Sequence, residues 1–216
     1  MMGRRIVILG AGFGGLFTAL ERDRRLRKET GLEIRLLDAR NFHLFSPMLH
    51  EVTSGIIEPR HVVWPIRALS GKTRLTFETR EVQSIDLENR RVLTDHGDVG
   101  YDVLVIALGS VTNYFGVSGA EEKAFTFKTL KDAVRLKNHI LEMFERAVLE
   151  RDPDLRRRLL AFVLVGAGCT GVELATEIDD LARKTLARHY PSLDVRDVRV
   201  VLAEATGRII PCVSDR

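Results

Sequence analysis

The residues of this chain best suited to chemistry form two glycine clusters, each placed between an apolar run and a helical pattern. The first cluster directly follows the apolar run at 6–9. In a strand–turn–helix unit, the first glycine makes the turn, the second lets the backbone approach a pyrophosphate, and the last lets the helix pack against the strand. The helix N-terminus then offers unpaired N–H groups to the phosphates. The cluster therefore predicts a dinucleotide site at Gly10, Gly12, Phe13, Gly14 and Gly15.

A carboxylate lies at the position where a dinucleotide site requires one. The apolar run at 32–37 ends in Asp38, which lies 23 positions after Gly15. This is close to the spacing of roughly 20 residues at which an acidic side chain binds a ribose hydroxyl. The first unit is therefore complete as strand, glycine turn, helix, strand and acid.

The same pattern recurs in the second half of the chain. A strand at 160–165 leads into a cluster that contains Gly166, Gly168, Thr170 and Gly171, and the strand at 198–203 ends in Glu204. A carboxylate there accepts hydrogen bonds from both ribose hydroxyls and repels a 2′-phosphate, which favours NADH over NADPH; Arg208, close by, could soften that preference. Two such units suggest two dinucleotides, of which a flavin and a nicotinamide are the usual pair.

The elements that position these clusters predict an α/β fold. We expect two Rossmann-like dinucleotide-binding units, the second truncated, with an antiparallel β meander inserted at about 74–99, where apolar and polar residues alternate. A helix at 16–30 follows the first cluster, and an apolar strand at 101–107 is expected to be buried on both faces. That strand ends in small residues that would admit a ligand, Ala107 and Gly109 among them.

Glycines at 116–119 indicate a boundary between a first domain, 1–116, and a second, 117–216. Thr129 and Asp132 resemble a capping box at the start of a long amphipathic helix, and Pro153 ends or restarts it. The segment 40–60 is irregular with a short helical pattern that ends at Gly55. It is apolar enough that it must cover either the core or a flat ligand.

Composition excludes several classes of function. A net charge of +3, with no basic patch interleaved with aromatics, argues against nucleic acid. Two cysteines give no disulfide framework or metal spacing, which fits a reducing, cytoplasmic compartment. The N-terminus lacks a signal-peptide pattern, and no stretch of about 20 apolar residues is present. His43, His50 and His61 lack further ligands, so no metal site is expected.

Three sequence stretches, at 41–49, 112–116 and 165–175, resemble type II NADH dehydrogenases, which are single-subunit, FAD-containing NADH:quinone oxidoreductases. The resemblance runs from Arg4 to Pro211 and implies FAD at the first cluster and NADH at the second. It implies that Asp38 and Arg40 join the glycines around the FAD phosphates and ribose. It further implies Ser46 and Pro47 near the isoalloxazine, the Val82 backbone at the adenine and Gly109 beside the flavin.

Glu173 falls on the carboxylate that this family places near the contact between nicotinamide and flavin. Because hydride transfer needs no general base, the residue is expected to orient a group or handle a proton. The alternative is a first-turn carboxylate favoured by the helix dipole. Cys169 is expected to be a small buried side chain, and the absence of a Cys-x4-Cys pair argues against the disulfide reductases of the same architecture.

The family runs to about twice this length, as two larger domains. We therefore expect this chain to lack the rest of the NADH domain, the returning segment of the FAD site, the quinone site and the C-terminal helices that dock on the membrane. Little turnover is expected from it alone. The full-length family lies peripherally on the cytoplasmic face of the inner membrane, and a homodimer is allowed. Two alternatives stay open: a flavoprotein reductase with a non-quinone acceptor, and a non-catalytic nucleotide-binding fragment.

Overall fold

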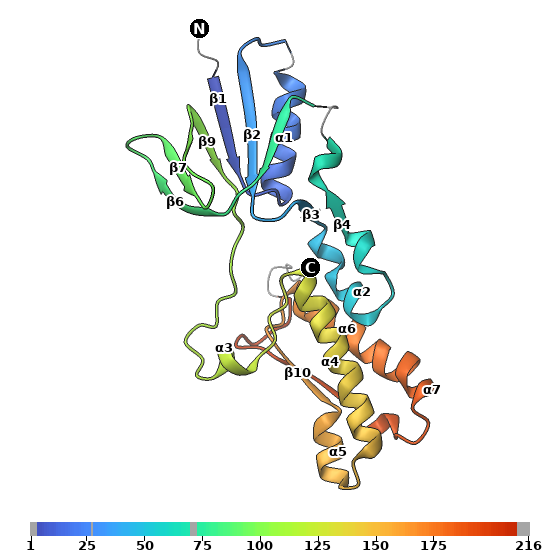
Figure 1. Ribbon diagram of the computed structural model, residues 1–216. Helices are drawn as coiled ribbons and strands as arrows, with labels where there is room; N and C mark the ends of the chain where they lie inside the picture. The colour runs from blue at the N-terminus through green and yellow to red at the C-terminus, as the bar shows by residue number, and fades with distance from the viewer. Residues whose placement is uncertain (1–3, 27, 70–72, 211–216) are drawn as a thin grey trace. The chain divides into compact units, whose positions relative to one another are not determined.

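The computed structural model describes residues 4–26, 28–69 and 73–210, which divide into two compact units (Figure 1). The first unit takes in the described residues up to Phe45 and those from Val63 to Asn113. The second takes in Ser46–Val62 and the described residues from Tyr114 onward. The final boundary between the units, after Asn113, thus lies three residues before the predicted boundary after Gly116. The segment 46–62, predicted in the first domain, clusters with the second unit instead.

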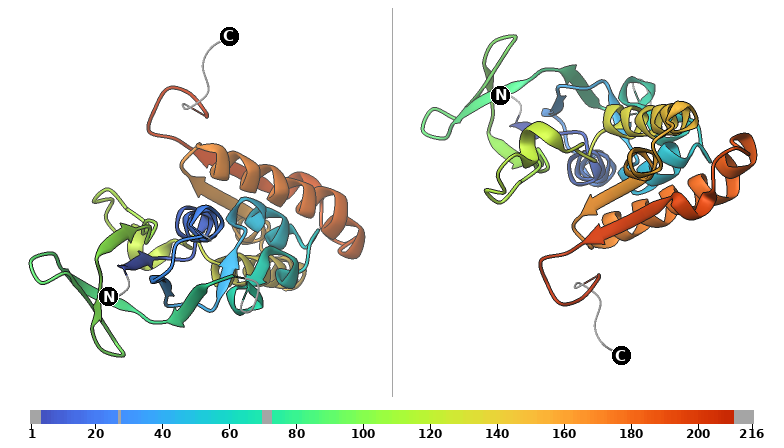
Figure 2. Two further views of the ribbon diagram at one scale, coloured as in Figure 1. Left: turned by 90° about the horizontal axis from the view of Figure 1, so that it is seen from above. Right: turned by 90° about the horizontal axis from the view of Figure 1, so that it is seen from below.

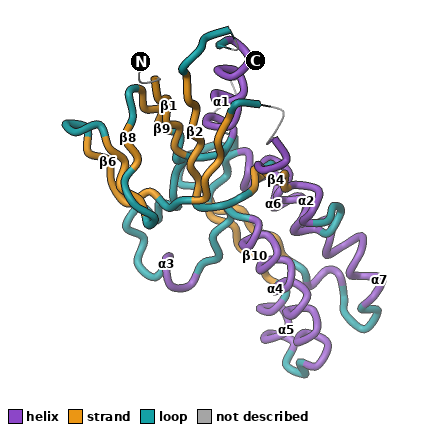
Figure 3. Tube along the Cα trace, turned by 45° about the horizontal axis from the view of Figure 1, so that its top comes forward, coloured by secondary structure: helices purple, strands orange, loops and turns teal. Residues whose placement is uncertain are grey.

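The first unit is built on a parallel sheet with the strand order β5-β2-β1-β9. Its strands are β1 (Arg4–Leu9), β2 (Leu32–Asp38), β5 (Leu75–Thr79) and β9 (Val103–Ile106), drawn in orange in Figure 3. Helix α1 (Phe13–Arg25) runs along one face of this sheet (Figure 1). The right-handed β1-α1-β2 order is that of a Rossmann-like unit.

The central strand β1 is buried on both of its faces, which explains its uninterrupted apolar run. Ile6 and Ile8 share a core with Leu16 and Ala19 of α1. Alternate residues point the other way, into a second core that contains Val7, Leu9, Leu37, Val92, Val99 and Tyr101. A parallel strand that is covered on both faces carries an uninterrupted apolar run because the side chains on neither face contact water.

The second core is closed by a small antiparallel meander of β6 (Val82–Asp86), β7 (Arg91–Thr94) and β8 (Val99–Gly100). The meander predicted at 74–99 is therefore wrong at its start. The alternating run 75–79 forms β5, which pairs in parallel with β2 in the main sheet. Alternation shows that one face of a strand is buried, but it does not show which strand lies beside it.

Two further predictions for this unit need correction. Helix α1 begins at Phe13 and ends at Arg25 rather than spanning 16–30. Its end is set by tertiary contacts, since Arg74 donates hydrogen bonds to the carbonyls of Leu26 (2.5 Å) and Glu29 (2.9 Å). Strand β9 is an edge strand, and Ile106 is 60% exposed, so the expected burial on both faces does not hold.

The second unit is mostly helical around a short parallel pair of strands. Its helices are α2 (Leu49–Ser54), α3 (Ala120–Lys123), α4 (Leu130–Leu149), α5 (Pro153–Leu159), α6 (Cys169–Asp180) and α7 (Ala187–His189). Six residues in π-helical conformation, Leu181–Leu186, join α6 to α7. The capping box of Thr129 and Asp132 is confirmed, as is the restart at Pro153, where Asp152 caps α5.

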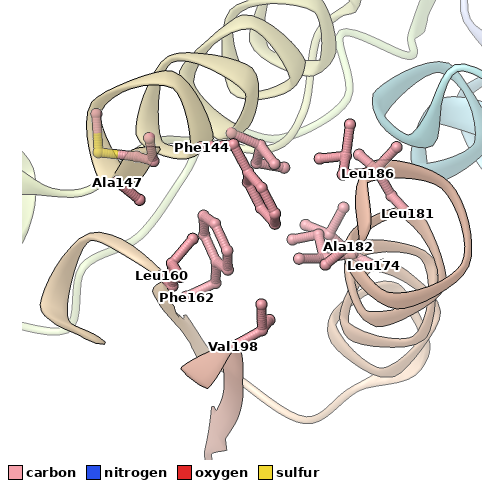
Figure 4. Close-up of a cluster of buried hydrophobic side chains, with 12 residues drawn as sticks. Phe144, Ala147, Leu160, Phe162, Leu174, Leu181, Ala182, Leu186 and Val198 are labelled. Atoms are coloured by element: carbon pink, nitrogen blue, oxygen red, sulfur yellow. The ribbon is translucent and has the colours of Figure 1, made fainter. Parts of the chain in front are cut away.

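Strands β10 (Ala161–Val165) and β11 (Arg199–Ala203) pair in parallel and lie side by side in both views of Figure 2. One face of the pair joins a core with α4 and α6, in which Phe144 lies close to Phe162, Leu174 and Leu186 (Figure 4). The other face is open, with Val163 63% and Val165 86% exposed.

Residues 46–62 join the second unit through α2, which packs against α4 and α6. Leu49, Val52 and Thr53 of α2 are buried, and Thr53 Oγ1 lies 3.4 Å from the carbonyl oxygen of Ala133 in α4. The predicted end of this helix at Gly55 is confirmed, since Gly55 is its left-handed C-cap. Of the helices in the described ranges, none has both the length and the apolar content needed to cross a bilayer.

Two shorter strands complete the first unit. β3 (Phe42–Leu44) pairs antiparallel with β4 (Val63–Pro65), on either side of the excursion into the second unit. A 3-10 turn, Ile66–Leu69, follows β4 and buries Ile66 beside the α1 core. The small β3–β4 sheet thus returns the chain to the first unit.

Candidate functional site

The first glycine cluster forms a tight turn between β1 and α1. Gly10 has a φ of +91°, and a Cβ there would lie 2.3 Å from the carbonyl oxygen of Ala107. A Cβ on Gly15 would lie 1.7 Å from the carbonyl oxygen of Gly10. The helix can approach the strand this closely because both positions lack a side chain. Ala107 itself donates its backbone N–H to Leu9 (2.8 Å), which keeps the end of β9 against the turn.

The ligand-facing part of this turn is open. A Cβ on Gly12, the N-cap of α1, would meet nothing within 4 Å, and one on Gly14 would meet only the Ala107 methyl group, at 3.7 Å. No side chain caps this end of α1, and its first turn carries no acidic residue. Its N–H groups are therefore available to an anion, as at dinucleotide phosphates. The residues present fit an FAD pyrophosphate.

Asp38 is fixed at the end of β2. Its Oδ2 accepts a hydrogen bond from the backbone N–H of Ala11 (2.6 Å), and its Oδ1 accepts one from that of Arg40 (2.8 Å). The Arg40 Nε lies 3.6 Å from the same Oδ1, while almost half of the Arg40 side chain remains exposed. The structure thus brings Asp38 and Arg40 together beside the glycine turn.

Sequence reasoning missed His43 as part of this turn. The His43 side chain is buried, and its Nδ1 lies 2.9 Å from the carbonyl oxygen of Ala11. Its ring also meets the Phe13 ring edge to face, with 4.9 Å between centroids, and Phe45 contacts Phe13 as well. The sequence at 42–45 carries no polar alternation that would have singled out His43, since both His43 and Leu44 of β3 are buried.

The remaining predicted flavin residues are spread over the chain. Val82 opens β6, and Gly109 follows β9 with a φ of +80° and open space where a Cβ would stand. Both belong to the first unit. Ser46 and Pro47 begin a 3-10 turn, Ser46–Met48, that belongs to the second unit.

The second cluster repeats the first turn closely. Gly166 has a φ of +102° and donates its N–H to Ala203 at the end of β11 (2.8 Å). A Cβ on Gly171 would lie 1.9 Å from the carbonyl oxygen of Gly166. Gly168 is the N-cap of α6 and gives no side-chain cap, and a Cβ there would meet nothing within 4 Å. Thr170 in the first turn is exposed, and so is Cys169, which corrects the expectation of a buried cysteine.

Glu204 takes the place that Asp38 has in the first unit. Its Oε2 accepts a hydrogen bond from the backbone N–H of Ala167 (2.6 Å), and its Oε1 accepts one from that of Thr206 (2.9 Å). These backbone donors lower the pKa of the Glu204 carboxyl, because hydrogen bonds to the charged form favour it. The carbonyl of Arg208 accepts a hydrogen bond from the Thr206 hydroxyl (3.1 Å), so Arg208 belongs to the same turn.

Glu173 is the fifth residue of α6, so it lies beyond the first turn and is not the dipole carboxylate considered as its alternative role. Half of its side chain is exposed, and its Oε2 lies 3.7 Å from Nδ1 of His50 in α2. Among the residues that the structure describes, no cluster of three or more His, Cys, Asp or Glu side chains could hold a metal ion.

Two strand–glycine–helix–strand units, each with an acid hydrogen-bonded to its own glycine turn, define a class of nucleotide-binding oxidoreductase. The family profile described as pyridine nucleotide-disulphide oxidoreductase matches residues 4–216, and the chain belongs to this family. Its relatives within the family include the type II NADH:quinone oxidoreductase Ndh of Mycobacterium tuberculosis, 36% identical over 212 residues. The expected resemblance to type II NADH dehydrogenases is thereby confirmed.

Two further proteins are similar to this chain. The type II NADH:quinone oxidoreductase of Staphylococcus epidermidis is 30% identical over 98% of this chain. The structure of NDH2 from Plasmodium falciparum in complex with NADH superposes with a TM-score of 0.88 at 24% identity, over 98% of this chain and 43% of that one, which establishes the shared fold. The chain spans about half the length of its curated relatives, 45% of the mycobacterial protein and 52% of the staphylococcal one.

Proposed function

We propose that this chain is the dinucleotide-binding part of an FAD-dependent NADH:quinone oxidoreductase. The observation that carries the proposal is the repeated turn: in both units the acid that ends the second strand accepts the N–H of the second residue of the glycine cluster, at 2.6 Å. The first unit would bind FAD, and the second would bind NADH. Bound FAD would supply the redox chemistry, which is hydride acceptance from NADH and electron transfer to a quinone.

The residues of the chain have separate tasks in this proposal. The N–H groups that open α1 and α6 would hold the two pyrophosphates, with Arg40 adding charge at the first. Asp38 and Glu204 would accept ribose hydroxyls. Glu204 would also repel a 2′-phosphate and so select NADH. Glu173 would orient the nicotinamide or hold a proton near it, and Ser46, Pro47, Val82 and Gly109 would line the flavin.

Binding of the two cofactors is the direct test. The purified 216-residue chain is mixed with FAD and passed over a gel-filtration column, and the visible flavin band in the protein peak is compared with that of Asp38→Ala. NADH binding is followed by its fluorescence. We expect wild type to retain FAD and bind NADH, and Asp38→Ala to lose FAD only. A wild-type chain that binds neither contradicts the proposal.

Nucleotide preference tests the second unit separately. We expect Glu204→Ala to weaken NADH binding roughly tenfold, the worth of a hydrogen bond to a charged group, and to relax the discrimination against NADPH. Glu142→Ala, on the exposed part of α4, is the matched control and should change neither affinity. An unchanged preference in Glu204→Ala removes this residue from the site.

We also propose that, in the full-length enzyme and not in this chain alone, a membrane quinone is the final acceptor and contact with the membrane is peripheral, on its cytoplasmic face. Quinone reductase activity of the FAD-loaded full-length enzyme, with and without anionic lipid vesicles, measures this part; the 216-residue chain alone should show little turnover. A soluble electron carrier that is reduced faster than a quinone would contradict it.

A further inference from the structure

A histidine and a glutamate from distant parts of the chain face each other in the second unit. His50 lies on α2 and Glu173 on α6, and Nδ1 of the imidazole is 3.7 Å from Oε2 of the carboxylate. The His50 side chain is only 18% exposed, whereas that of Glu173 is 50% exposed. The histidine is therefore held in place, and the glutamate is the freer of the two.

The position of His50 is fixed by its helix. Leu49, Val52 and Thr53 are buried, with 3%, 1% and 0% of their surface exposed. Beyond the end of α2, a Cβ on Gly55 would lie only 2.9 Å from Nζ of Lys137, so this side chain of α4 reaches that end. With one face packed against α4 and α6, the helix directs His50 toward Glu173 of α6.

The charged groups around His50 are mostly acidic. Glu51 of α2 brings its Oε1 to 4.0 Å from the imidazole Nε2, on the side opposite Glu173. Glu177 follows Glu173 by one turn of α6 and so shares its face, with Oε2 buried and without a hydrogen-bond partner. On α4, the Nζ of Lys137 lies 2.9 Å from where a Cβ on Gly55, the C-cap of α2, would be. His50 of α2 can therefore donate a hydrogen bond to this group of carboxylates.

We propose that His50 is a positioning residue for Glu173: its Nδ1–H is donated toward Oε2 and orients the carboxylate, leaving Oε1 to face a ligand. A small rotation of the half-exposed Glu173 side chain brings Oε2 from ion-pair range to hydrogen-bond distance. This rests on the proposed function, in which Glu173 acts at the nicotinamide. No bond to carbon forms or breaks, and no proton leaves the pair.

The imidazole tautomer is the first test. Long-range proton–nitrogen NMR spectra of the 216-residue chain are recorded at high pH, where imidazoles are neutral, and the His50 signals are assigned from their loss in His50→Asn. We expect the Nδ1–H tautomer in wild type and a shift toward Nε2–H in Glu173→Ala. Glu51→Ala, which removes the carboxylate on the opposite side of the ring, should leave the tautomer unchanged. An Nε2–H tautomer in wild type, or a shift in Glu51→Ala alone, overturns the proposal.

NADH affinity is the second test, with two variants of the same position. Asparagine can place an N–H where Nδ1 stands, and leucine cannot. We expect His50→Leu to weaken NADH binding by about two- to fivefold, the range of a partly exposed side-chain pair, and His50→Asn to retain the affinity. In a Glu173→Ala background, His50→Leu should have no further effect.

The two tests separate this proposal from the one on which it rests. Equal weakening by His50→Leu and His50→Asn shows a packing role and overturns the positioning role. A wild-type chain that fails to bind NADH defeats the proposed function, while the tautomer result still decides whether Glu173 and His50 are paired.

Discussion

The two glycine turns are nearly identical in their local geometry but lie in different surroundings. In each, the first glycine donates its N–H to the end of the second strand, to Leu37 at 2.7 Å and to Ala203 at 2.8 Å. Their N-cap glycines share extended backbone angles, with φ of −71° and −69°. The first turn, however, lies against Ala107, the residue after the third strand β9, whereas a Cβ on Gly166 would meet nothing within 4 Å. Within the described residues, the local β-α-β geometry is therefore the same beside a third strand and without one.

The largest expected effect comes from the glycines that let helix and strand touch. Gly15→Ala and Gly171→Ala each place a methyl group under 2 Å from a backbone oxygen. Backbone must move, so we expect each to cost more than about 3 kcal/mol of unfolding free energy. The measurement is urea unfolding with hydrogen exchange, which assigns the loss to one unit. Gly12→Ala and Gly168→Ala are the matched controls and should change stability by less than about 1 kcal/mol.

The first glycines should respond unequally, which sharpens the comparison. Both have positive φ, which costs a residue with a side chain about 1–2 kcal/mol. Gly10→Ala adds a clash with the Ala107 carbonyl at 2.3 Å, and Gly166→Ala adds none. We expect Gly10→Ala to lower the unfolding free energy by at least about 1 kcal/mol more than Gly166→Ala does. Equal losses would show that a backbone shift near Ala107 absorbs the clash.

The strands that lead into the turns should also differ. Val7 of β1 is fully buried, whereas Val165 of β10 is 86% exposed. Val7→Ala is expected to cost about 2 kcal/mol because it leaves a cavity, and Val165→Ala close to nothing. Thermal unfolding of the two variants measures this. A large loss from Val165→Ala would mean that the open face of β10 is covered in solution.

The smallest expected effect concerns pH. Because the folded-state pKa of Glu204 is lowered, its contribution to stability is present above the ordinary glutamate pKa and is lost as the pH falls through the folded value. Stability should therefore fall less between neutral and acidic pH in Glu204→Gln than in wild type. Carbon-detected titration of the carboxylates measures the Glu204 pKa. Urea unfolding at neutral and acidic pH measures the stability, with Glu142→Gln as the control. A Glu204 pKa at or above the ordinary value would show that the backbone hydrogen bonds are not kept in solution.

The sequence by itself determined both turns, because each depends on residues close together in the chain and on spacings that no other element changes. It also determined the capping box at Thr129, the restart at Pro153 and the left-handed stop at Gly55, all of which are local. The family resemblance followed from three short stretches, at 41–49, 112–116 and 165–175.

Only the tertiary structure decided which segments lie together. It placed 75–79 beside β2, 46–62 against α4 and α6, and the end of α1 under Arg74. It brought His43 onto the carbonyl of Ala11, and His50 to Glu173. The contact between His50 and Glu173 joins residues 123 positions apart in the chain. Periodicity reports only that a face is buried; the partner that buries it is chosen by the packing of the whole unit.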